Sequence, residues 1–377
     1  MNIPFFDNRR SVERILPALE AELPDMLEQN TLVNGEQVRR LEDEICVYTG
    51  AGYAIATGNA TDSLTIALAA LGIGPGDEVI VPCYSFFASV SSVMHVGATP
   101  VFVDIEPGSY SMDPSAIESR ISPRTRAIMP VHLFRQMADM DAINAIAEKH
   151  KLFVVEDSAE GIGMRHDDVH AGLVSHIGVL SFFPTKTLGA LGDAGMVLTN
   201  DPVLAAKARQ IADNGRDDAG LAQGPGFNSR LDDLQALYLR LQLAHVDADI
   251  LWRAQCARSY DKHLSDLPGL QTPRLRMRDK PQRVVDYVYL LEADRRDELA
   301  RHLAEHRIGT ETYYPMPLHL QPACAHLGYW TGDFPVAEAA ARRALALPMY
   351  ADLTDADIQQ VCSVITALYP NQQRESA

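Results

Sequence analysis

An acidic residue and a lysine lie close enough along the chain to share one active site. The apolar run 152–155 is followed by Glu156 and Asp157, which is the pattern of a buried parallel strand that ends at carboxylates. In open α/β sheets, ligands bind at the carboxyl ends of the strands, so Asp157 is well placed to meet a cofactor. A second apolar run, 178–183, contains Ser181 and leads to Lys186. We therefore expect a carboxylate and an amine at one edge of the same sheet.

This pair of side chains suits pyridoxal 5'-phosphate (PLP). PLP needs a lysine amine for its Schiff base and an acidic partner for its pyridinium nitrogen. A carboxylate keeps that nitrogen protonated, because a nearby opposite charge favours the charged form. Lys186 would bind the cofactor and then act as general base and acid. Taken alone, each residue has a commoner role, since an aspartate at a strand end usually caps a helix and a loop lysine is usually exposed.

An upstream turn could bind the phosphate of such a cofactor. A short strand at 53–56 is followed by the small-residue turn 57–63 and then by a helix with one apolar face. Free N–H groups and the positive end of the helix dipole converge at such a helix start. We expect the backbone of Ala60 and Thr61 to bind phosphate, although Thr61 could simply cap the helix.

Three motifs carry a family resemblance. They are EDSAEG at 156–161, SFFPTK at 181–186 and LGALGDAGMVLTND at 188–201. Together they resemble the DegT/DnrJ/EryC1/StrS family of PLP-dependent sugar aminotransferases of fold type I, and the similarity continues over nearly the whole chain. The resemblance implies transfer of an amino group from an amino acid, by analogy L-glutamate, to a nucleotide-linked keto-deoxysugar in amino-sugar biosynthesis.

The same resemblance implies roles for further residues. Phe86 would stack on the PLP ring, and Ser181 would bind its phosphate. Asn228 would reach the phosphate in the neighbouring subunit's site, which implies a homodimer with shared active sites. Three more residues would face the sugar nucleotide: Arg230, Tyr314 and His319.

Besides a mild departure at Asn59-Ala60-Thr61, where the family usually has S-G-T, two residues depart from the family pattern. Glu160 stands where the family has Gln or His, which bonds the phenolic oxygen of PLP. Two anions in contact are unfavourable, so Glu160 would be protonated, turned elsewhere or used on the sugar. Arg135 replaces a glycine next to His132, and His132 fits a structural role as well as a catalytic one.

The order of elements predicts an α/β fold with a mostly parallel central sheet flanked by helices. Short apolar strands alternate with helical segments, for example at 79–81, 100–104 and 127–131. We expect a PLP-binding large domain with an N-terminal arm over 1–245, and a small C-terminal α+β domain over 246–377. A long helix at 241–260 would connect them.

Composition excludes several classes of protein. The 377 residues are 47% hydrophobic and 22% charged, with a formal net charge of −17 at pH 7, which argues against nucleic-acid binding. Five cysteines without a C-x-x-C pair argue against disulfides and a metal site. No signal peptide and no run of 18 apolar residues occur, so we expect a cytoplasmic protein that does not contact membranes.

Other functions stay open at this point. Family members that lack the lysine act as PLP-dependent sugar dehydratases, and Lys186 argues against that activity. If Glu160 disables amino transfer, the chain would be a PLP-binding regulatory or scaffold protein without turnover. A nicotinamide dehydrogenase is disfavoured, because no G-x-G-x-x-G follows an early strand. The sequence does not decide the sugar, the nucleotide or the carbon that is aminated.

Overall fold

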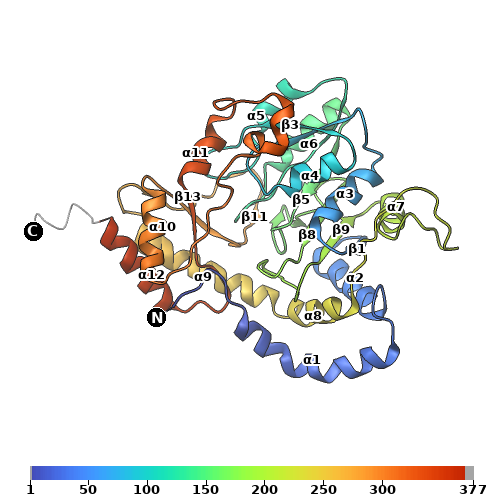
Figure 1. The fold of residues 1–377 in the computed structure, drawn as a ribbon, viewed down its shortest axis with the longest axis horizontal. Coiled ribbons are helices and arrows are strands. Elements are labelled where there is room, and N and C mark those ends of the chain that lie inside the picture. The colour runs from blue at the N-terminus through green and yellow to red at the C-terminus, as the bar shows by residue number, and fades with distance from the viewer. Residues whose placement is uncertain (1, 370–377) are drawn as a thin grey trace, which may run out of the picture.

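The computed structural model describes residues 2–369 (Figure 1). Its centre is a seven-stranded sheet in the order β1-β9-β8-β5-β4-β2-β3. The pairs from β8 to β3 are parallel, whereas β9 runs antiparallel to both of its neighbours. The strands are β1 Tyr53–Thr57, β2 Glu78–Pro82, β3 Thr99–Val103, β4 Thr125–Ile128, β5 Phe153–Asp157, β8 Ile177–Ser181 and β9 Gly195–Thr199. The predicted α/β fold with a mostly parallel sheet is confirmed.

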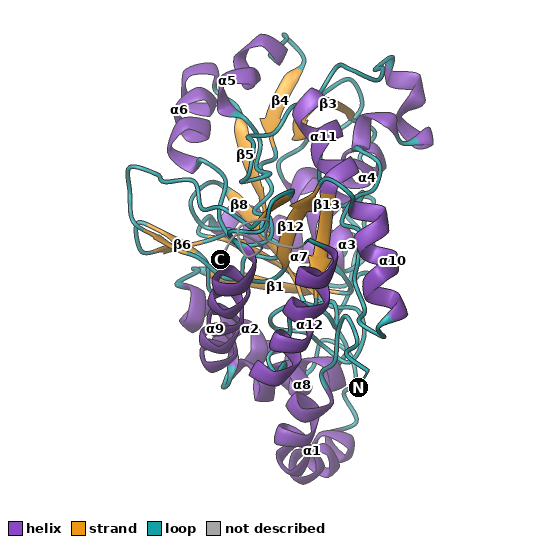
Figure 2. Cartoon of the chain, turned by 90° about the vertical axis from the view of Figure 1, so that its left-hand side faces the viewer, coloured by secondary structure: helices purple, strands orange, loops and turns teal. Residues whose placement is uncertain are grey.

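Helices cover both faces of this sheet because neighbouring residues of a strand point to opposite sides. In β2, Val79 and Val81 belong to the core beneath α3, α4 and α7, whereas Ile80 belongs to the core beneath α2, α6 and α8. Strands β4, β5 and β8 lie side by side between these layers (Figure 2). The helices are α2 Glu36–Thr49, α3 Ala60–Ala70, α4 Ala88–His95, α5 Pro114–Ile117, α6 Met140–His150, α7 Pro202–Ala212 and α8 Asp233–Leu243.

A third core lies in the C-terminal part of the chain. It is built from a three-stranded antiparallel sheet with helices beside it. Ile3 also packs into this core and forms a bridge with Ile308, so the start of the chain joins the C-terminal core. The elements are β10 Leu270–Gln271, β12 Tyr289–Ala293, β13 Ala344–Leu347, α9 Val246–Leu264, α10 Arg296–Glu305, α11 Pro335–Arg343 and α12 Asp355–Leu368.

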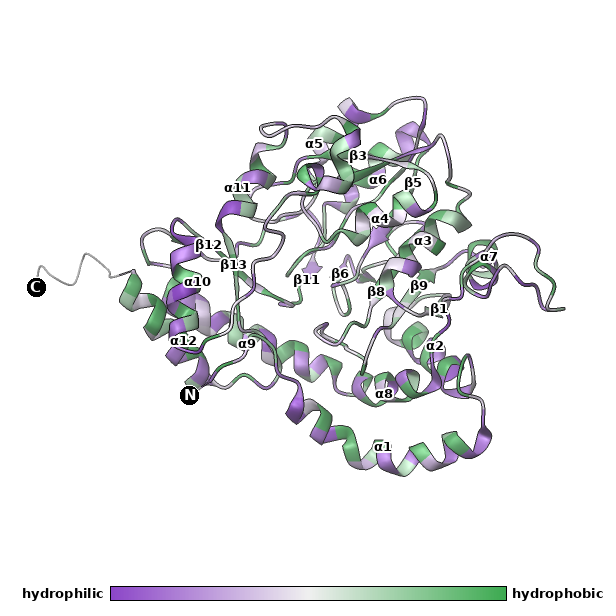
Figure 3. Ribbon diagram, viewed as in Figure 1, coloured by the Kyte–Doolittle hydropathy of each residue, from purple (hydrophilic) through white to green (hydrophobic). Residues whose placement is uncertain are grey.

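Two helical segments differ from expectation. The long helix expected at 241–260 is interrupted, because α8 ends at Leu243 and α9 begins at Val246. The helix α1, Arg9–Gln29, was not expected, and it contains Pro17 and Pro24. It lies along α8 (Figure 1), and like α12 it carries both hydrophobic and hydrophilic residues along its length (Figure 3).

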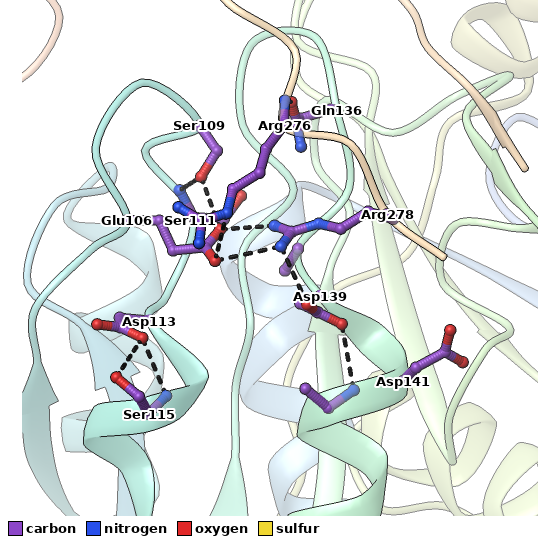
Figure 4. A network of polar contacts seen from close by, with 12 residues as sticks. Glu106, Ser109, Ser111, Asp113, Ser115, Gln136, Asp139, Asp141, Arg276 and Arg278 are labelled. Atoms are coloured by element: carbon purple, nitrogen blue, oxygen red, sulfur yellow. Dashed lines mark hydrogen bonds and ion pairs between the residues drawn. The ribbon is translucent and has the colours of Figure 1, made fainter. Parts of the chain in front are cut away.

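A basic segment that we call the strap (residues 272–283) follows β10 and forms ion pairs with residues that lie after β3 and before α6. Arg278 lies 2.5 Å from Glu106 and 3.0 Å from Asp139, and Arg276 lies 3.1 Å from Glu106 (Figure 4). Arg278 and Glu106 are both buried side chains. The strap ends in β11, Gln282–Arg283, which pairs with the hairpin of β6, Arg165–His166, and β7, Val169–His170.

No helix within residues 2–369 is long and apolar enough to cross a membrane. The same residues contain no cluster of His, Cys, Asp and Glu side chains arranged to hold a metal ion.

Candidate active site

Asp157 lies at the carboxyl end of β5 and is almost completely buried, with 4% of its surface exposed. The Ser89 hydroxyl donates a hydrogen bond to Oδ2 at 2.8 Å, and the backbone N–H of Ala159 donates to Oδ1 at 3.3 Å. No cationic side chain in the described chain lies within 4.0 Å of this carboxylate. Burial raises the pKa of Asp157, because a buried anion loses its hydration.

Lys186 follows β8 in a turn that is closed by its own N–H group, which donates to the carbonyl of Phe183. Its ammonium Nζ lies 3.4 Å from Oε1 of Glu160 and 4.5 Å from the centroid of the Tyr287 ring. Burial opposes the charged form, but Tyr287, Glu160 and Asp157 together raise the pKa of Lys186. Asp157 therefore favours the charged form of Lys186, whose side chain is 16% exposed.

Glu160 is turned toward the backbone and the lysine. Its Oε2 accepts the N–H of Phe134 at 2.6 Å, while Oε1 faces Lys186. Phe134 has a φ of 62°, and this left-handed conformation aims its N–H group at the carboxylate. Burial raises the pKa of Glu160, and the positive charge of Lys186 opposes that effect.

The expected phosphate site forms where three strands meet α3. Thr57 pairs with Gly195, and Gly195 pairs with Ser181, so the ends of β1, β9 and β8 are level with one another. Asn59 caps α3 by accepting the N–H of Asp62 at 2.8 Å. Within the described residues, the N–H groups of Ala60 and Thr61 have no acceptor, which leaves them free for an anion.

Phe86 and Tyr314 lie at the same side of the sheet. Phe86 follows β2 and is 63% exposed, so its ring is free to stack on a bound cofactor. Tyr314 packs in parallel with Phe134, and burial together with the charge of Glu160 raises its pKa.

Asn228 and Arg230 are not brought to Lys186 within one chain. Arg230 Nε donates to Oδ1 of Asn228 at 3.0 Å, and the Arg230 guanidinium lies 3.5 Å from Asp213. Neither residue makes a contact with Asp157 or Lys186 in the part of the chain that the structure describes.

His319 and His132 both have structural partners. His319 is buried beside the rings of Phe102 and Phe334, and its Nε2 lies 3.3 Å from Glu338. His319 therefore does not face the space around Lys186. His132 is buried 3.0 Å from Glu156 and its Nδ1 accepts the N–H of Ala138.

Sequence reasoning missed three residues of the site: Ser89, Phe134 and Tyr287. Ser85 and Ser89 are four residues apart at the start of α4 and bond to each other, so a pair of serines beside the predicted strand end was a usable signal. Tyr287 lies two residues before β12 in an apolar run that only predicts a strand. Its contact with Lys186 joins segments that are about a hundred residues apart in the sequence, and no local pattern reports such a contact.

These residues fit PLP. A buried carboxylate without a cationic partner matches a pyridinium N–H, and the free N–H groups at the start of α3 match a phosphate. Lys186 supplies the amine that binds the cofactor aldehyde. The strand ends thus carry a buried carboxylate, an amine and free N–H groups at one edge of the sheet, which is the set of groups that PLP would need.

A family model described as the DegT/DnrJ/EryC1/StrS aminotransferase family matches residues 15–366. The chain is 41% identical to the "Pleiotropic regulatory protein" of Geobacillus stearothermophilus over 98% of this chain and 99% of that protein. It is 38% identical to the UDP-2-acetamido-2-deoxy-3-oxo-D-glucuronate aminotransferase of Pseudomonas aeruginosa, over 97% of this chain and 99% of that enzyme.

Solved structures agree with this similarity. DesV of S. venezuelae, in complex with a ketimine intermediate, superposes with a TM-score of 0.94 at 36% identity and covers 98% of this chain and 99% of its own. NtdA of Bacillus subtilis, with the bound cofactor PMP, superposes with a TM-score of 0.89 at 30% identity. The match covers 98% of this chain and 86% of the NtdA chain.

Proposed function

Because the chain belongs to the DegT/DnrJ/EryC1/StrS aminotransferase family, we propose that it moves an amino group from L-glutamate to the keto group of a nucleotide-linked deoxysugar. The family, the cofactor PLP and the sugar aminotransferase activity expected from the motifs are confirmed. The single observation that carries the proposal is the shared burial of Lys186 and Asp157 beside a free helix start.

Each residue of the site has a defined task in this proposal. PLP, when bound, withdraws electrons from the substrate carbon, so that a proton on that carbon becomes acidic. Asp157 keeps the ring nitrogen protonated, and Ser89 fixes the orientation of the carboxylate. Lys186 carries the proton between the substrate carbon and the cofactor. Ala60, Thr61 and Ser181 hold the phosphate end, and Phe86 excludes water from one face of the ring.

A homodimer with shared active sites completes the proposal. Several large apolar side chains are exposed in the single chain, among them Phe86 and Phe183, which follow strands of the site, and Leu191, Phe227 and Leu234. An apolar surface of this kind is typical of a protein interface. Asn228 follows Phe227 directly, so burial of this segment against a second copy would carry Asn228 to the neighbouring site.

The substrate nucleotide is an anion, and the chain has a formal net charge of −17. Local cations must therefore attract it, and Arg230 with Tyr314 are the proposed ligands. Arg230 is held by Asp213 and Asn228, which would orient its guanidinium. The buried pairing of His319 with Glu338 favours a role in holding the loop that carries Tyr314.

A regulatory role without turnover is the second candidate. It is favoured by the name of the Geobacillus relative, which is 41% identical and is called a pleiotropic regulatory protein. A sugar dehydratase is less favoured, because the lysine is present and is paired with Glu160.

Spectra of a single turnover test the enzyme against the regulator. Purified protein should show a visible absorbance band that L-glutamate converts to the pyridoxamine phosphate spectrum. dTDP-, UDP- and GDP-linked 3-keto and 4-keto sugars are then tested for restoring the band. Lys186→Ala should abolish both steps, whereas Lys207→Ala, at an exposed helical position, should abolish neither. A bound cofactor that no amino acid converts would support the regulator.

A further inference from the structure

The ammonium group of Lys186 lies between a carboxylate and an aromatic ring. Oε1 of Glu160 is 3.4 Å from Nζ, and the ring centroid of Tyr287 is 4.5 Å from Nζ. A cation within about 6 Å of an aromatic face is attracted by the electrons of the ring. The lysine therefore has two favourable partners that do not depend on a cofactor.

Both partners are held by one residue of the loop after β4. The N–H of Phe134 donates to Oε2 of Glu160 at 2.6 Å, and the carbonyl of Phe134 accepts the N–H of Tyr287 at 2.9 Å. The backbone of Phe134 thus fixes the gap in which Nζ sits. The φ of Phe134 is 62°, in the left-handed region, so the local backbone conformation sets the directions of its N–H and carbonyl groups.

The ring of Tyr287 is fixed further by two contacts. Its hydroxyl lies 3.2 Å from Oγ1 of Thr185, the residue before the lysine, and its carbonyl accepts Nη1 of Arg253 at 3.0 Å. Only 5% of Tyr287 is exposed. With its backbone held at the N–H and the carbonyl and its ring held at the hydroxyl, Tyr287 keeps the ring face toward Lys186 without further loss of conformational entropy.

We propose that Glu160 and Tyr287 form a resting position for the Lys186 ammonium whenever the lysine is not bonded to the cofactor, and that Tyr287 is a positioning residue for it. The inference rests on the proposed aminotransferase function, in which the amino donor displaces the lysine. A released lysine has many rotamers. The resting position confines the ammonium between Glu160 and the ring of Tyr287 and keeps it in place to give up a proton.

The test measures directly how readily the Lys186 amine reacts as a function of pH. Full-length protein loaded with pyridoxamine phosphate has a free Lys186, and acetic anhydride acetylates only its uncharged amine. The pH midpoint of acetylation, read by mass spectrometry, reports how strongly the ammonium is held. Other groups that face Lys186 or its adjoining cavity stay constant in these variants: Asp157, Glu160, Asp7, Asp249, Arg253, Tyr238 and Tyr350.

A series of phenylalanines with increasing fluorine content at position 287 is the decisive set, because fluorine removes electron density from the ring face at nearly constant shape. We expect the midpoint to fall stepwise with fluorination, and Tyr287→Leu to lower it by about one pH unit. Tyr287→Phe should stay near wild type, as should Tyr289→Phe, whose hydroxyl bonds Asp261 instead. A flat fluorine series would overturn the proposal.

Kinetics separate this inference from the proposed function. Tyr287→Leu should lower kcat by about tenfold with little change in KM, because a lysine side chain that samples many rotamers transfers its proton more slowly. Equal losses in Tyr287→Phe and Tyr287→Leu would contradict a role for the ring face. If wild-type protein fails to convert any amino acid while the fluorine series still shifts the midpoint, the resting position stands and the aminotransferase proposal fails.

Discussion

At the scale of single residues, the Asp157 carboxylate is central to the proposed cofactor site, but burying its charge destabilises the folded protein. Its carboxylate is buried without a cation in contact, so the charged form is stabilised mainly by Ser89 and one backbone N–H. A buried ion without a counter-charge costs several kcal/mol in general. The cofactor-free protein should therefore be strained at this position, and binding of a pyridinium should relieve that strain.

We predict that Asp157→Asn stabilises the cofactor-free protein and abolishes turnover. The folded-state pKa of this acid lies above its unfolded value of 3.8, so its unfavourable contribution is absent below pH 3.8, grows from there up to the folded-state pKa, and is constant above it. The gain in Tm should accordingly increase as the pH rises from about 4 and level off above the folded-state pKa. Differential scanning calorimetry checks the trend, and Asp25→Asn, at an exposed site of α1, should show none. A gain that is independent of pH would contradict the assignment of the strain to this charge.

At the scale of elements, the sequence predicted the parallel strands of the central sheet well. It did not predict β9, which runs antiparallel to both of its neighbours. Strands β2, β3 and β5 each lie within one or two residues of the expected positions, because continuous apolar runs in a doubly covered sheet have few alternatives. β9 lies within the glycine-rich motif, where glycines mask the strand pattern. Helix α1 was missed because Pro17 and Pro24 are normally unfavourable inside a helix.

The same contrast holds for the site. Asp157, Ser181, Lys186 and the start of α3 were predicted because they follow strand ends, and strand ends meet at one edge of the sheet. Tyr287 was not predicted because its place depends on how two domains dock.

The junction of β9 with α3 offers a test of the phosphate cradle. A Cβ atom on Gly195 would lie 2.5 Å from the carbonyl carbon of Asn59 and 2.6 Å from the nitrogen of Ala60. Gly195→Ala must therefore push the helix start away, and we predict a loss of roughly 1–3 kcal/mol in PLP binding. Absorbance titration of cofactor-free protein measures this. Gly224→Ala, where no atom lies within 4 Å of the added Cβ, is the matched control. Unchanged affinity in Gly195→Ala would disprove the cradle.

The strap offers a test of how the domains are joined. Removing the guanidinium in Arg278→Ala leaves Glu106 and Asp139 without their shared partner, and Glu106 is buried (Figure 4). We predict a loss of about 3–5 kcal/mol in unfolding free energy, the usual effect of breaking a buried pair. Arg283→Ala, which removes an exposed pair with Asp247, should cost at most about 1 kcal/mol. Urea denaturation followed by circular dichroism compares them, and similar losses in both variants would show that burial of the strap pair matters little.

At the scale of the whole molecule, one chain does not bring Asn228 and Arg230 to Lys186, and the proposed homodimer would supply them from a second copy. Asn228 and Arg230 lie on a segment that contacts Asp213 but not the lysine, and the neighbouring Phe227 is exposed. The sequence could place these residues near a cofactor only through the family resemblance, because a residue that acts in a second copy leaves no pattern in its own chain. In the proposed dimer, two chains that each carry a formal net charge of −17 would repel each other. The apolar surface between them would have to outweigh that repulsion.

Complementation between two inactive variants decides whether Asn228 serves the partner's site. Lys186→Ala and Asn228→Asp are each expected to be severely impaired as homodimers, the second because a carboxylate would repel the phosphate. In a mixed dimer, the Lys186→Ala subunit would lend its intact Asn228 to the intact Lys186 of the other subunit, which restores one site. Random pairing makes half of the dimers mixed, so activity should recover to about one quarter of wild type. Co-expression with two affinity tags isolates the mixed dimer, and size-exclusion chromatography confirms its mass. If Asn228 acted within its own chain, every site would carry one of the two substitutions and the mixture would stay inactive.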